Sequence, residues 1–284
     1  MLCFEGKLSL VCFSVTAITI FTLLAPQLFF QIVPNKYNAI FWGPAFYYAL
    51  INMILRYKLK GDSYQIGIRA SFLGFTFTVS ALILCYAPFQ YKSFGIYGMT
   101  MSLFHYTEFL TLAWSNPENL SVSSFILNHS VQYAIAAISS WIEFIVEIYF
   151  WPNMKCYWIL WVIGFTICFI GEFLRKLAMI TAKRNFTHLV QFEKRKGHKL
   201  ITHGIYRIMR HPSYVGWFWW SIGTQIILCN PICTILYTIV SWKFFSERIY
   251  IEEITLINFF GKQYFDYQKK VGIGIPFIKG YQLE

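Results

Sequence analysis

Two short polar segments interrupt the apolar carboxyl-terminal third of the chain, at residues 210–214 and 247–253. The second contains Arg248, whose planar guanidinium can hold a carboxylate through two parallel hydrogen bonds. The first contains Pro212, which suits the first turn of a helix, where free backbone N–H groups favour an anion. These residue types predict a binding site for a carboxylate and other polar ligands.

Both segments also have a simpler interpretation. Arg248 and Glu252 are spaced i, i+4, so they could form an ion pair on one helix face, worth about 0.3–0.5 kcal/mol. Arg210 and His211 could merely anchor a helix end among the lipid headgroups. An arginine that faces other helices near a membrane boundary is a functional candidate, however, and this location favours the ligand-binding interpretation.

The composition places these segments in an integral membrane protein. Of the 284 residues, 57% are hydrophobic and only 13% are charged, which is too little polar surface for a soluble protein of this size. The net charge of +11 lies between apolar runs, which indicates contact with anionic lipid rather than nucleic acid. The seven cysteines include no CxxC pair, so neither disulfides nor a metal site is predicted.

Eight apolar runs are long enough to cross a membrane. The second is interrupted by Gly43-Pro44, and the fourth carries His105 and Glu108 one turn apart. No repeat or linker indicates a second domain, so residues 1–284 are predicted to form one all-α membrane domain of about eight transmembrane helices. The predicted spans are residues 8–25, 38–55, 66–87, 95–113, 131–150, 157–180, 212–229 and 231–250.

With eight spans, both termini lie on the same side of the membrane, and the basic residues separate accordingly. Lys36, Lys92 and Lys155 fall in connections on the opposite side, whereas most of the 24 lysines and arginines fall on the terminal side. The positive-inside rule therefore predicts that both termini and the polar segments face the cytosol.

The last two spans are predicted to bring positions 212 and 248 together. Cys229-Asn230-Pro231 is the predicted hinge of a helical hairpin, and the two positions are equally far from Asn230 along the chain. At about 1.5 Å per residue, both lie about 27 Å from the turn, close to the thickness of the hydrocarbon core. The two polar segments should therefore meet at one membrane surface.

Residues 181–284 are predicted to form the catalytic region, supported by six amino-terminal helices in residues 1–180. The loop at the start of this region, residues 181–211, is too rich in aromatic and branched residues to be a disordered tether. Loops of this length are usually functional. The last helix should continue to Phe260, stop at Gly261 and protrude about 10–15 Å from the membrane. The region comprises a cytosolic loop (181–211), a helical hairpin (212–250) and a cytosolic helix extension with a tail (251–284).

Five further ionisable residues lie within the apolar runs. Glu143 and Glu147 share one helix face, where two charges that pointed into lipid would be unfavourable. We interpret these groups as polar contacts between helices, with a direct catalytic role as the alternative. The five residues are His105, Glu108, Glu143, Glu147 and Glu172.

Motifs in residues 190–280 resemble the carboxyl-terminal half of isoprenylcysteine carboxyl methyltransferases. The segment from Arg210 through Gln225 is similar to the animal enzymes in particular, as is Pro276-Phe277-Ile278-Lys279-Gly280. The eight-span layout is also similar. The other matching motifs are Gln191, His198-Lys199-Leu200-Ile201, Gly204-Ile205-Tyr206, Cys229-Asn230-Pro231, Glu252-Glu253, Phe260-Gly261, Tyr264 and Tyr267.

Enzymes of that family methylate the α-carboxylate of a prenylated cysteine at the end of a CaaX-processed protein. The resemblance implies that this chain does the same with S-adenosylmethionine and releases S-adenosylhomocysteine. It implies farnesyl- or geranylgeranyl-cysteine of prenylated proteins, such as small GTPases of the Ras and Rho types, as partners within membrane lipid. It also implies a multi-pass protein of the endoplasmic reticulum whose active site faces the cytosol.

Carried over residue by residue, the resemblance directs Arg248 at the substrate carboxylate. Relatives have a run of glutamates after this arginine, whereas here Ile249-Tyr250-Ile251 precedes Glu252. Lys199 stands where relatives can have a neutral residue, which indicates a backbone contact there. The implied cofactor site comprises Gln191, His198, Lys199, Leu200, Ile201, Tyr206, His211, Pro212, Ser213, Tyr214 and Glu252, with no metal.

This chemistry is consistent with the residues present. A prenylcysteine carboxylate is already ionised at neutral pH, so methyl transfer from a sulfonium needs no general base. It needs alignment of the reacting atoms and removal of water from the attacking oxygen. The prenyl chain would enter sideways from lipid between helices, while the cofactor arrives from water.

Three other functions remain possible on the sequence. A membrane methyltransferase for lipid amines has the same general plan, but an amine would need an acidic or aromatic receptor rather than Arg248. A sterol reductase also has this plan and would bind NADPH. A channel or lipid-binding scaffold would use the intramembrane carboxylates as a pathway, but it leaves the ordered-looking loop 181–211 unexplained.

Overall fold

The computed structural model describes residues 1–29, 36–127 and 130–282, and the regular secondary structure in these ranges is entirely helical. The predicted all-α class is confirmed. The long helices are α1 (Phe4–Phe29), α2 (Lys36–Lys58), α3 (Gly61–Tyr86), α4 (Lys92–Ser115), α5 (Val131–Phe150), α6 (Trp158–Ala182), α7 (Pro212–Ile227) and α8 (Pro231–Phe260), followed by the short α9 (Lys262–Lys270). Short 3-10 turns lie at Phe89–Tyr91, Pro117–Asn119, Val122–Phe125, Pro152–Cys156, Lys183–Asn185 and Gly204–Arg207.

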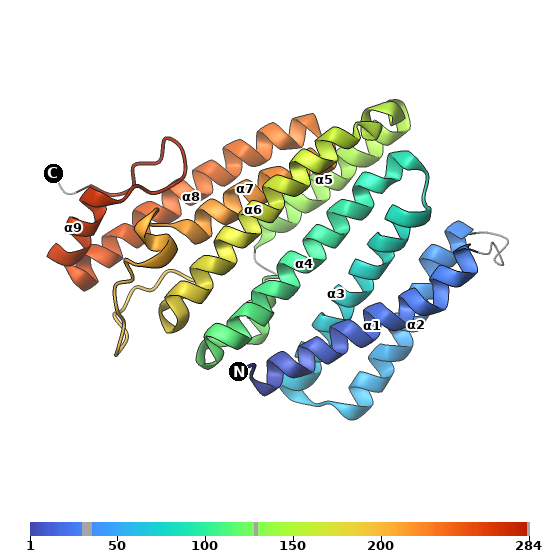
Figure 1. The fold of residues 1–284 in the computed structure, drawn as a ribbon, viewed down its shortest axis with the longest axis horizontal. Helices are drawn as coiled ribbons and strands as arrows, with labels where there is room; N and C mark the ends of the chain where they lie inside the picture. Colours follow the sequence, from blue (N-terminus) through green and yellow to red (C-terminus); the bar gives the residue numbers. More distant parts are fainter. Residues whose placement is uncertain (30–35, 128–129, 283–284) are drawn as a thin grey trace.

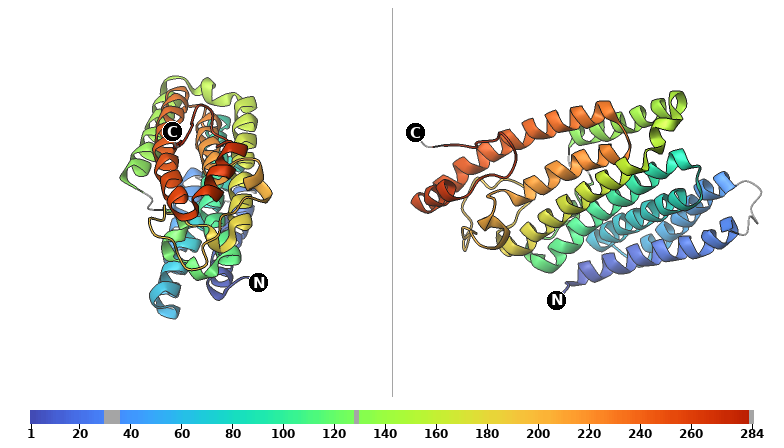
Figure 2. Two further views of the ribbon diagram at one scale, coloured as in Figure 1. Left: turned by 90° about the vertical axis from the view of Figure 1, so that its left-hand side faces the viewer. Right: turned by 45° about the horizontal axis from the view of Figure 1, so that its top comes forward.

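The long helices lie side by side in one elongated bundle (Figure 1). The amino-terminal helices form one edge, α4 and α6 lie in the middle, and α7, α8 and α9 form the other edge (Figure 2). Each predicted apolar run overlaps one long helix, and several helices extend beyond the run, by up to ten residues at the end of α8. The Gly43-Pro44 pair does not interrupt the second helix, because α2 continues through Pro44 to Lys58. A helix tolerates an internal proline where neighbouring helices support it.

Within the described residues, four helices are long and apolar enough to cross a membrane. They include the described stretches Phe4–Ala25, Gly61–Tyr86, Val131–Phe150 and Trp158–Asn185. Many of their large apolar side chains face outward; Ile145 of α5, for example, is 62% exposed. An exposed apolar surface of this extent suits a lipid environment. The predicted number of eight spans stays a prediction.

Helices α6 and α7 approach so closely that their backbones touch. A Cβ on Gly216 would lie 2.4 Å from the carbonyl oxygen of Gly171, and a Cβ on Gly223 would lie 2.8 Å from that of Gly164. Small residues at such positions allow close helix packing inside membranes. The two glycine contacts therefore fix α7 against α6 and set the position of its first turn.

The turn between α7 and α8 is fastened by a buried lysine. Lys155 is fully buried, and its Nζ donates to the carbonyl oxygens of Leu228 at 2.9 Å and Cys229 at 3.0 Å, and to Asn230 Oδ1 at 2.8 Å. Its Nζ also lies 2.5 Å from Glu147 Oε2. The predicted hinge is confirmed, because α7 ends at Ile227 and α8 begins at Pro231.

Glu143 supports the same turn from α5. Its two carboxylate oxygens accept hydrogen bonds from the backbone N–H groups of Ile232 at 2.8 Å and Cys233 at 2.7 Å. These are N–H groups of the first turn of α8, which have no partner within the helix. Glu143 and Glu147 thus act as polar contacts between helices, as the sequence predicts.

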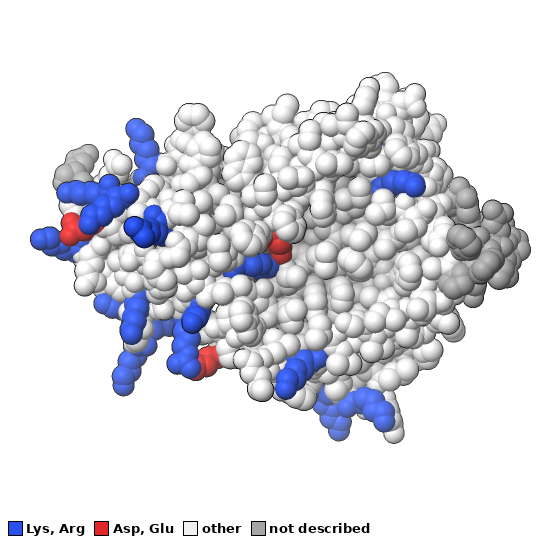
Figure 3. Space-filling model, in the orientation of Figure 1, with Lys and Arg blue, Asp and Glu red and all other residues white. Residues whose placement is uncertain are grey.

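Basic side chains gather on one side of the molecule (Figure 3). On the face shown, lysines and arginines cluster at the end where α9 lies and along the adjoining lower edge, while the rest of the face carries few. The amino terminus lies on the same side as α9 (Figure 1). This separation is what the positive-inside rule predicts for one membrane surface.

Candidate active site

A cavity of about 120 Å³ lies between the first turn of α7, the outer part of α8 and the loop that precedes α7. The structure brings together at this cavity every residue that the sequence assigned to the cofactor or the substrate. These are Gln191, His198, Lys199, Leu200, Ile201, Tyr206, His211, Pro212, Ser213, Tyr214, Arg248 and Glu252. Their roles toward particular ligands stay predictions.

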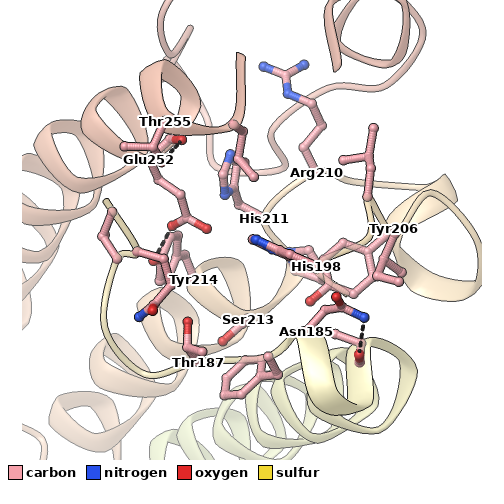
Figure 4. A pocket seen from close by; sticks show the side chains of 18 of the residues that line it. Asn185, Thr187, His198, Tyr206, Arg210, His211, Ser213, Tyr214, Glu252 and Thr255 are labelled. Atoms are coloured by element: carbon pink, nitrogen blue, oxygen red, sulfur yellow. Dashed lines mark hydrogen bonds between the residues drawn. The ribbon is translucent and has the colours of Figure 1, made fainter. Parts of the chain in front are cut away.

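Figure 4 shows how the side chains surround the cavity. His198, His211, Tyr214 and Glu252 lie around one space, with Tyr206 at its edge, whereas the guanidinium of Arg210 points away from it. Aromatic, imidazole and carboxylate groups on three separate segments therefore converge. Such a combination suits a ligand with both aromatic and polar parts.

Tyr214 connects Arg248 with Glu252. Arg248 Nε donates to the Tyr214 hydroxyl oxygen at 3.0 Å, and this hydroxyl donates to Glu252 Oε2. Arg248 and Glu252 form no direct ion pair among the described residues, so the simple i, i+4 pairing is wrong. Tyr214 instead bridges the two side chains from the neighbouring helix.

A second contact fixes the guanidinium of Arg248 from the loop. Its Nη2 donates to the carbonyl oxygen of His188 at 2.5 Å, and its Cζ lies 5.5 Å from the centre of the Tyr214 ring. Nη1 makes no hydrogen bond within the described part of the chain. The arginine is thus held in place while one of its terminal nitrogens keeps its donors for a ligand.

His211 is oriented by a buried carboxylate behind the cavity. Its ring stacks on Tyr214 with centroids 5.6 Å apart and an angle of 7°, and its Nε2 lies 3.2 Å from Glu253 Oε1. Arg210 Nε donates to the same oxygen at 2.8 Å. Burial opposes ionisation of Glu253, but the hydrogen bond and charge of His211 and the charge of Arg210 lower its pKa below the ordinary value. Glu253 therefore stays ionised at neutral pH and holds both basic groups.

Helix geometry explains why the two adjacent glutamates differ. Successive residues of an α-helix point about 100° apart, because 3.6 residues make one turn. Glu252 consequently lines the cavity, while Glu253 is fully buried behind it. The resemblance assigned Glu252 to the cofactor site, and this member of the pair lines the cavity.

The loop also contributes an imidazole to the cavity. His198 packs edge-on against Phe259 and Phe260 of α8, with ring centroids 5.7 and 5.3 Å away. Its Nδ1 is buried and has no partner among the described residues. Burial and the positive charges of Arg195 and Lys194 lower the pKa of His198, so the ring is neutral at pH 7. A buried polar atom of this kind in a cavity wall indicates a ligand contact.

Lys199 lines the cavity and is fastened through its backbone, while its predicted backbone contact with the cofactor stays a prediction. Its side chain is exposed, and its backbone N–H donates to Asn185 Oδ1 at 2.8 Å. The loop is therefore fastened to the end of α6 by its backbone at this point. Asn185 was not identified from the sequence, although it also lines the cavity.

A buried charge cluster from α4 and α6 lies beside the cavity. Glu108 is fully buried and accepts from Arg175 Nε at 2.6 Å, from Arg175 Nη2 at 2.7 Å and from Lys176. His188 Nε2 lies 3.0 Å from the same carboxylate. Arg175 Nη1 in turn donates to Ser213 Oγ at 2.7 Å. Glu108 thereby supports both the loop and the first turn of α7.

A larger apolar groove of about 320 Å³ adjoins this cavity between α5, α7 and α8. Trp217 lines both hollows. The rim of the groove includes Ile135, Leu236 and Val240, which are 57%, 50% and 60% exposed. The groove therefore opens at the outward-facing apolar surface, the side on which lipid would lie.

Comparison with known proteins gives consistent results. Residues 162–258 match the model of the isoprenylcysteine carboxyl methyltransferase family. A protein-S-isoprenylcysteine O-methyltransferase from Tribolium castaneum is 48% identical over 284 residues and all of both chains. The Homo sapiens protein of that name is 50% identical over 242 residues, 85% of each chain.

A solved structure shares the fold as well as the sequence. It is described as the eukaryotic intramembrane Ras methyltransferase, an isoprenylcysteine carboxyl methyltransferase, and is 48% identical. The likeness has a TM-score of 0.95 and covers 99% of this chain and 100% of that one. The predicted membrane-embedded helical fold is thereby confirmed.

Proposed function

Because this chain belongs to the isoprenylcysteine carboxyl methyltransferase family, it methylates the carboxyl group of a prenylated cysteine, and we propose that its methyl donor is S-adenosylmethionine. One observation carries the proposal. Arg248 lines the polar cavity, and its Cζ also lies 5.9 Å from the ring of Phe244, which lines the apolar groove. A carboxylate-binding group therefore lies where a water-side and a lipid-side hollow adjoin.

The polar cavity has the groups that S-adenosylmethionine requires. Glu252 accepts hydrogen bonds and suits the ribose hydroxyls or the amine of the ligand. The buried Nδ1 of His198 suits one polar atom of the adenine. Tyr206, Leu200 and Ile201 add apolar and aromatic surface, and Gln191, Lys199, His211, Pro212 and Ser213 complete the proposed site.

Arg248 is the proposed substrate-positioning residue. A carboxylate is ionised at neutral pH, so the residues around it need not remove a proton. The guanidinium can hold both carboxylate oxygens, and the hydrogen bonds to Tyr214 and the His188 carbonyl fix its orientation. When bound, S-adenosylmethionine supplies an electrophilic methyl group on a sulfonium sulfur.

The apolar groove is the proposed site of the prenyl chain. Its walls combine aromatic and branched side chains such as Tyr237, Val240 and Phe245 with the edge of Trp217. A farnesyl or geranylgeranyl chain buries a large apolar area there, which favours binding. The bound prenyl group also excludes water, so the carboxylate near Arg248 is more weakly hydrated.

The reaction would take place at the cytosolic surface of an intracellular membrane. The substrates would be carboxyl-terminal prenylcysteines of small GTPases of the Ras and Rho types. The protein would lie in the endoplasmic reticulum membrane with both termini and the active site in the cytosol. The basic side chains on the side of α9 support this orientation by the positive-inside rule.

The direct test is a radiolabelled methyl transfer assay. Purified protein is mixed with labelled S-adenosylmethionine and N-acetyl-farnesylcysteine, and base-labile methyl ester is measured. Ester formation that depends on the prenyl chain is expected; no transfer to the farnesyl or geranylgeranyl compound would contradict the proposal. Calorimetric titration with S-adenosylhomocysteine and with NADPH should give binding only to the former, which separates this function from that of a reductase.

A further inference from the structure

The segment after α9 returns to the bundle instead of extending away from it. The backbone carbonyls of Gly272 and Ile273 accept hydrogen bonds from the backbone N–H groups of Arg210 at 2.8 Å and His211 at 3.4 Å. Farther on, the N–H of Tyr281 donates to Glu253 Oε2 at 2.9 Å. Residues 272–281, here called the tail loop, are thus fastened to the active-site region at both ends. Figure 2 shows the loop as a dark red arch beside α8.

The inner face of the tail loop is part of a hydrophobic core. Ile273, Ile275 and Ile278 are 4%, 4% and 8% exposed, and they pack in one cluster with Val215 of α7 and Ile249 of α8. Two glycines allow this close fit and have positive φ angles. A Cβ on Gly274 would lie 2.7 Å from Val215 Cγ2, and a Cβ on Gly280 would lie 2.0 Å from Glu253 Oε2. The loop therefore has a defined position on α7 and α8.

The tip of the loop reaches closer to the membrane than Arg248 does. The indole N–H of Trp242 donates to the carbonyl oxygen of Pro276 at 2.8 Å. Trp242 precedes Arg248 by six positions on α8, so at 1.5 Å per residue it lies about 9 Å nearer the hairpin turn. Its neighbour Lys243 is exposed. Tryptophan and lysine together mark the boundary between hydrocarbon and headgroups.

Phe277 projects from this tip with no cover. It is 92% exposed, and its φ angle of 64° lies in the left-handed region, which a bulky side chain rarely adopts. The exposure of so large an apolar ring is unfavourable in water. Lys279 is exposed two residues further on, so basic groups flank the aromatic ring on both α8 and the loop.

From these contacts we infer that the tail loop is a membrane-interface anchor, with the Phe277 ring inserted among the lipids of the surface on which the active site lies. The bound partner is the bilayer itself, at the junction of headgroups and acyl chains. Lys243 and Lys279 would then contact anionic headgroups. The prediction that residues 251–284 are wholly cytosolic would then not hold for the tail loop.

Labelling of single introduced cysteines tests this inference. Phe277→Cys and, as a water-exposed control on α9, Lys262→Cys are each made in full-length protein whose exposed Cys85 is replaced by serine. The proteins are reconstituted in vesicles that contain anionic lipid and are treated with a charged maleimide. We expect the cysteine at 277 to react at least tenfold more slowly than the one at 262, and both to react equally after unfolding in detergent. Equal rates in vesicles would place the tip in water and overturn the inference.

A second measurement distinguishes lipid from protein cover. A fluorophore is attached at the same two positions before reconstitution with lipids brominated near the headgroup end of their acyl chains. Quenching at 277 but not at 262 is the expected result. Slow maleimide reaction at 277 without quenching by brominated lipid would mean that protein covers the tip, and this would also overturn the inference.

Discussion

Arg248 and Tyr214 lie on different helices, 34 residues apart, yet their Nε and hydroxyl oxygen are 3.0 Å from each other. The same hydroxyl donates a hydrogen bond to Glu252. The arginine that suits the substrate and the carboxylate that suits the cofactor are thus connected through one phenol. Substitutions at this connection should separate binding of the two ligands from the transfer between them.

Replacement of Arg248 by alanine should abolish transfer while the cofactor still binds. Loss of a charged donor to a carboxylate in a site of low dielectric lowers turnover by about 10²- to 10³-fold. Arg248→Lys should retain part of the activity, because an ammonium keeps the charge without the planar fork. The assay is methyl transfer together with calorimetry on S-adenosylhomocysteine. Near-normal turnover in the alanine variant would show that the assigned role is wrong.

Removal of one oxygen in Tyr214→Phe should impair catalysis without loss of the ring. Hydrogen bonds to charged groups contribute about 1.5–3 kcal/mol, so kcat/KM should fall by about one to two orders of magnitude. Tyr250→Phe is the matched control, since Tyr250 is 48% exposed and its hydroxyl makes no hydrogen bond to described residues. Equal activity of the two variants would contradict the bridging role of Tyr214.

Glu108→Gln should destabilise the whole bundle. The substitution leaves Arg175 without its buried counter-charge and removes one of the two carboxylates that pair with Lys176, and breaking a buried ion pair costs about 3–5 kcal/mol. The control is Glu118→Gln, because its ion pair with Arg184 is 62% and 75% exposed and such pairs contribute under about 1 kcal/mol. Equilibrium unfolding in detergent compares the two. Similar losses would mean that the cluster contributes no more than a surface pair.

Stability should decrease as pH falls below the ordinary pKa of His198. Burial and the neighbouring positive charges lower its pKa from 6.5, so the unfolded chain takes up this proton first. The loss of stability due to His198 is absent well above pH 6.5. It grows as the pH falls from there through the lowered pKa, and then levels off. Unfolding temperatures of wild type and His198→Gln across this window should differ in slope, with the variant flatter. Parallel curves of unfolding temperature against pH for the two proteins would contradict the lowered pKa of His198.

Gly216→Ala should push α6 and α7 apart. Its new Cβ would lie 2.4 Å from the backbone oxygen of Gly171, which cannot move aside. Overpacking of this kind costs about 1–3 kcal/mol. Gly272→Ala is the control, because a Cβ there meets nothing within 4 Å and should change stability by less than about 0.5 kcal/mol. Unfolding of both variants in detergent gives the comparison.

The helices and their hairpin could be predicted from the sequence because the relevant signals are local. The apolar runs and Pro231 after a tight turn are sufficient to place α7 and α8. Helix rise then sets Pro212 level with Arg248, with Tyr214 close by. The role of Glu108 could not be predicted in this way. Its partner Arg175 is 67 positions away, and only the packing of α4 against α6 shows that they meet.

The course of the tail was also beyond local signals. Residues 272–281 contain three isoleucines and one lysine but no helical period, so their return to α7 depends on hydrogen bonds to the backbone of Arg210 and His211. Likewise, the direction of Glu253 became clear only once Arg210, Tyr264 and Gln268 were seen to surround it.

The position of Glu108 limits how small a working version of this protein can be made. The stretch that matches the family model, residues 162–258, holds Arg175 but not Glu108, the buried carboxylate with which Arg175 pairs. A truncated protein reduced to that stretch would keep much of the cavity wall but would leave the buried charge of Arg175 without Glu108. The minimal transplantable unit therefore has to begin upstream of α4, well outside the signature by which such enzymes are recognised.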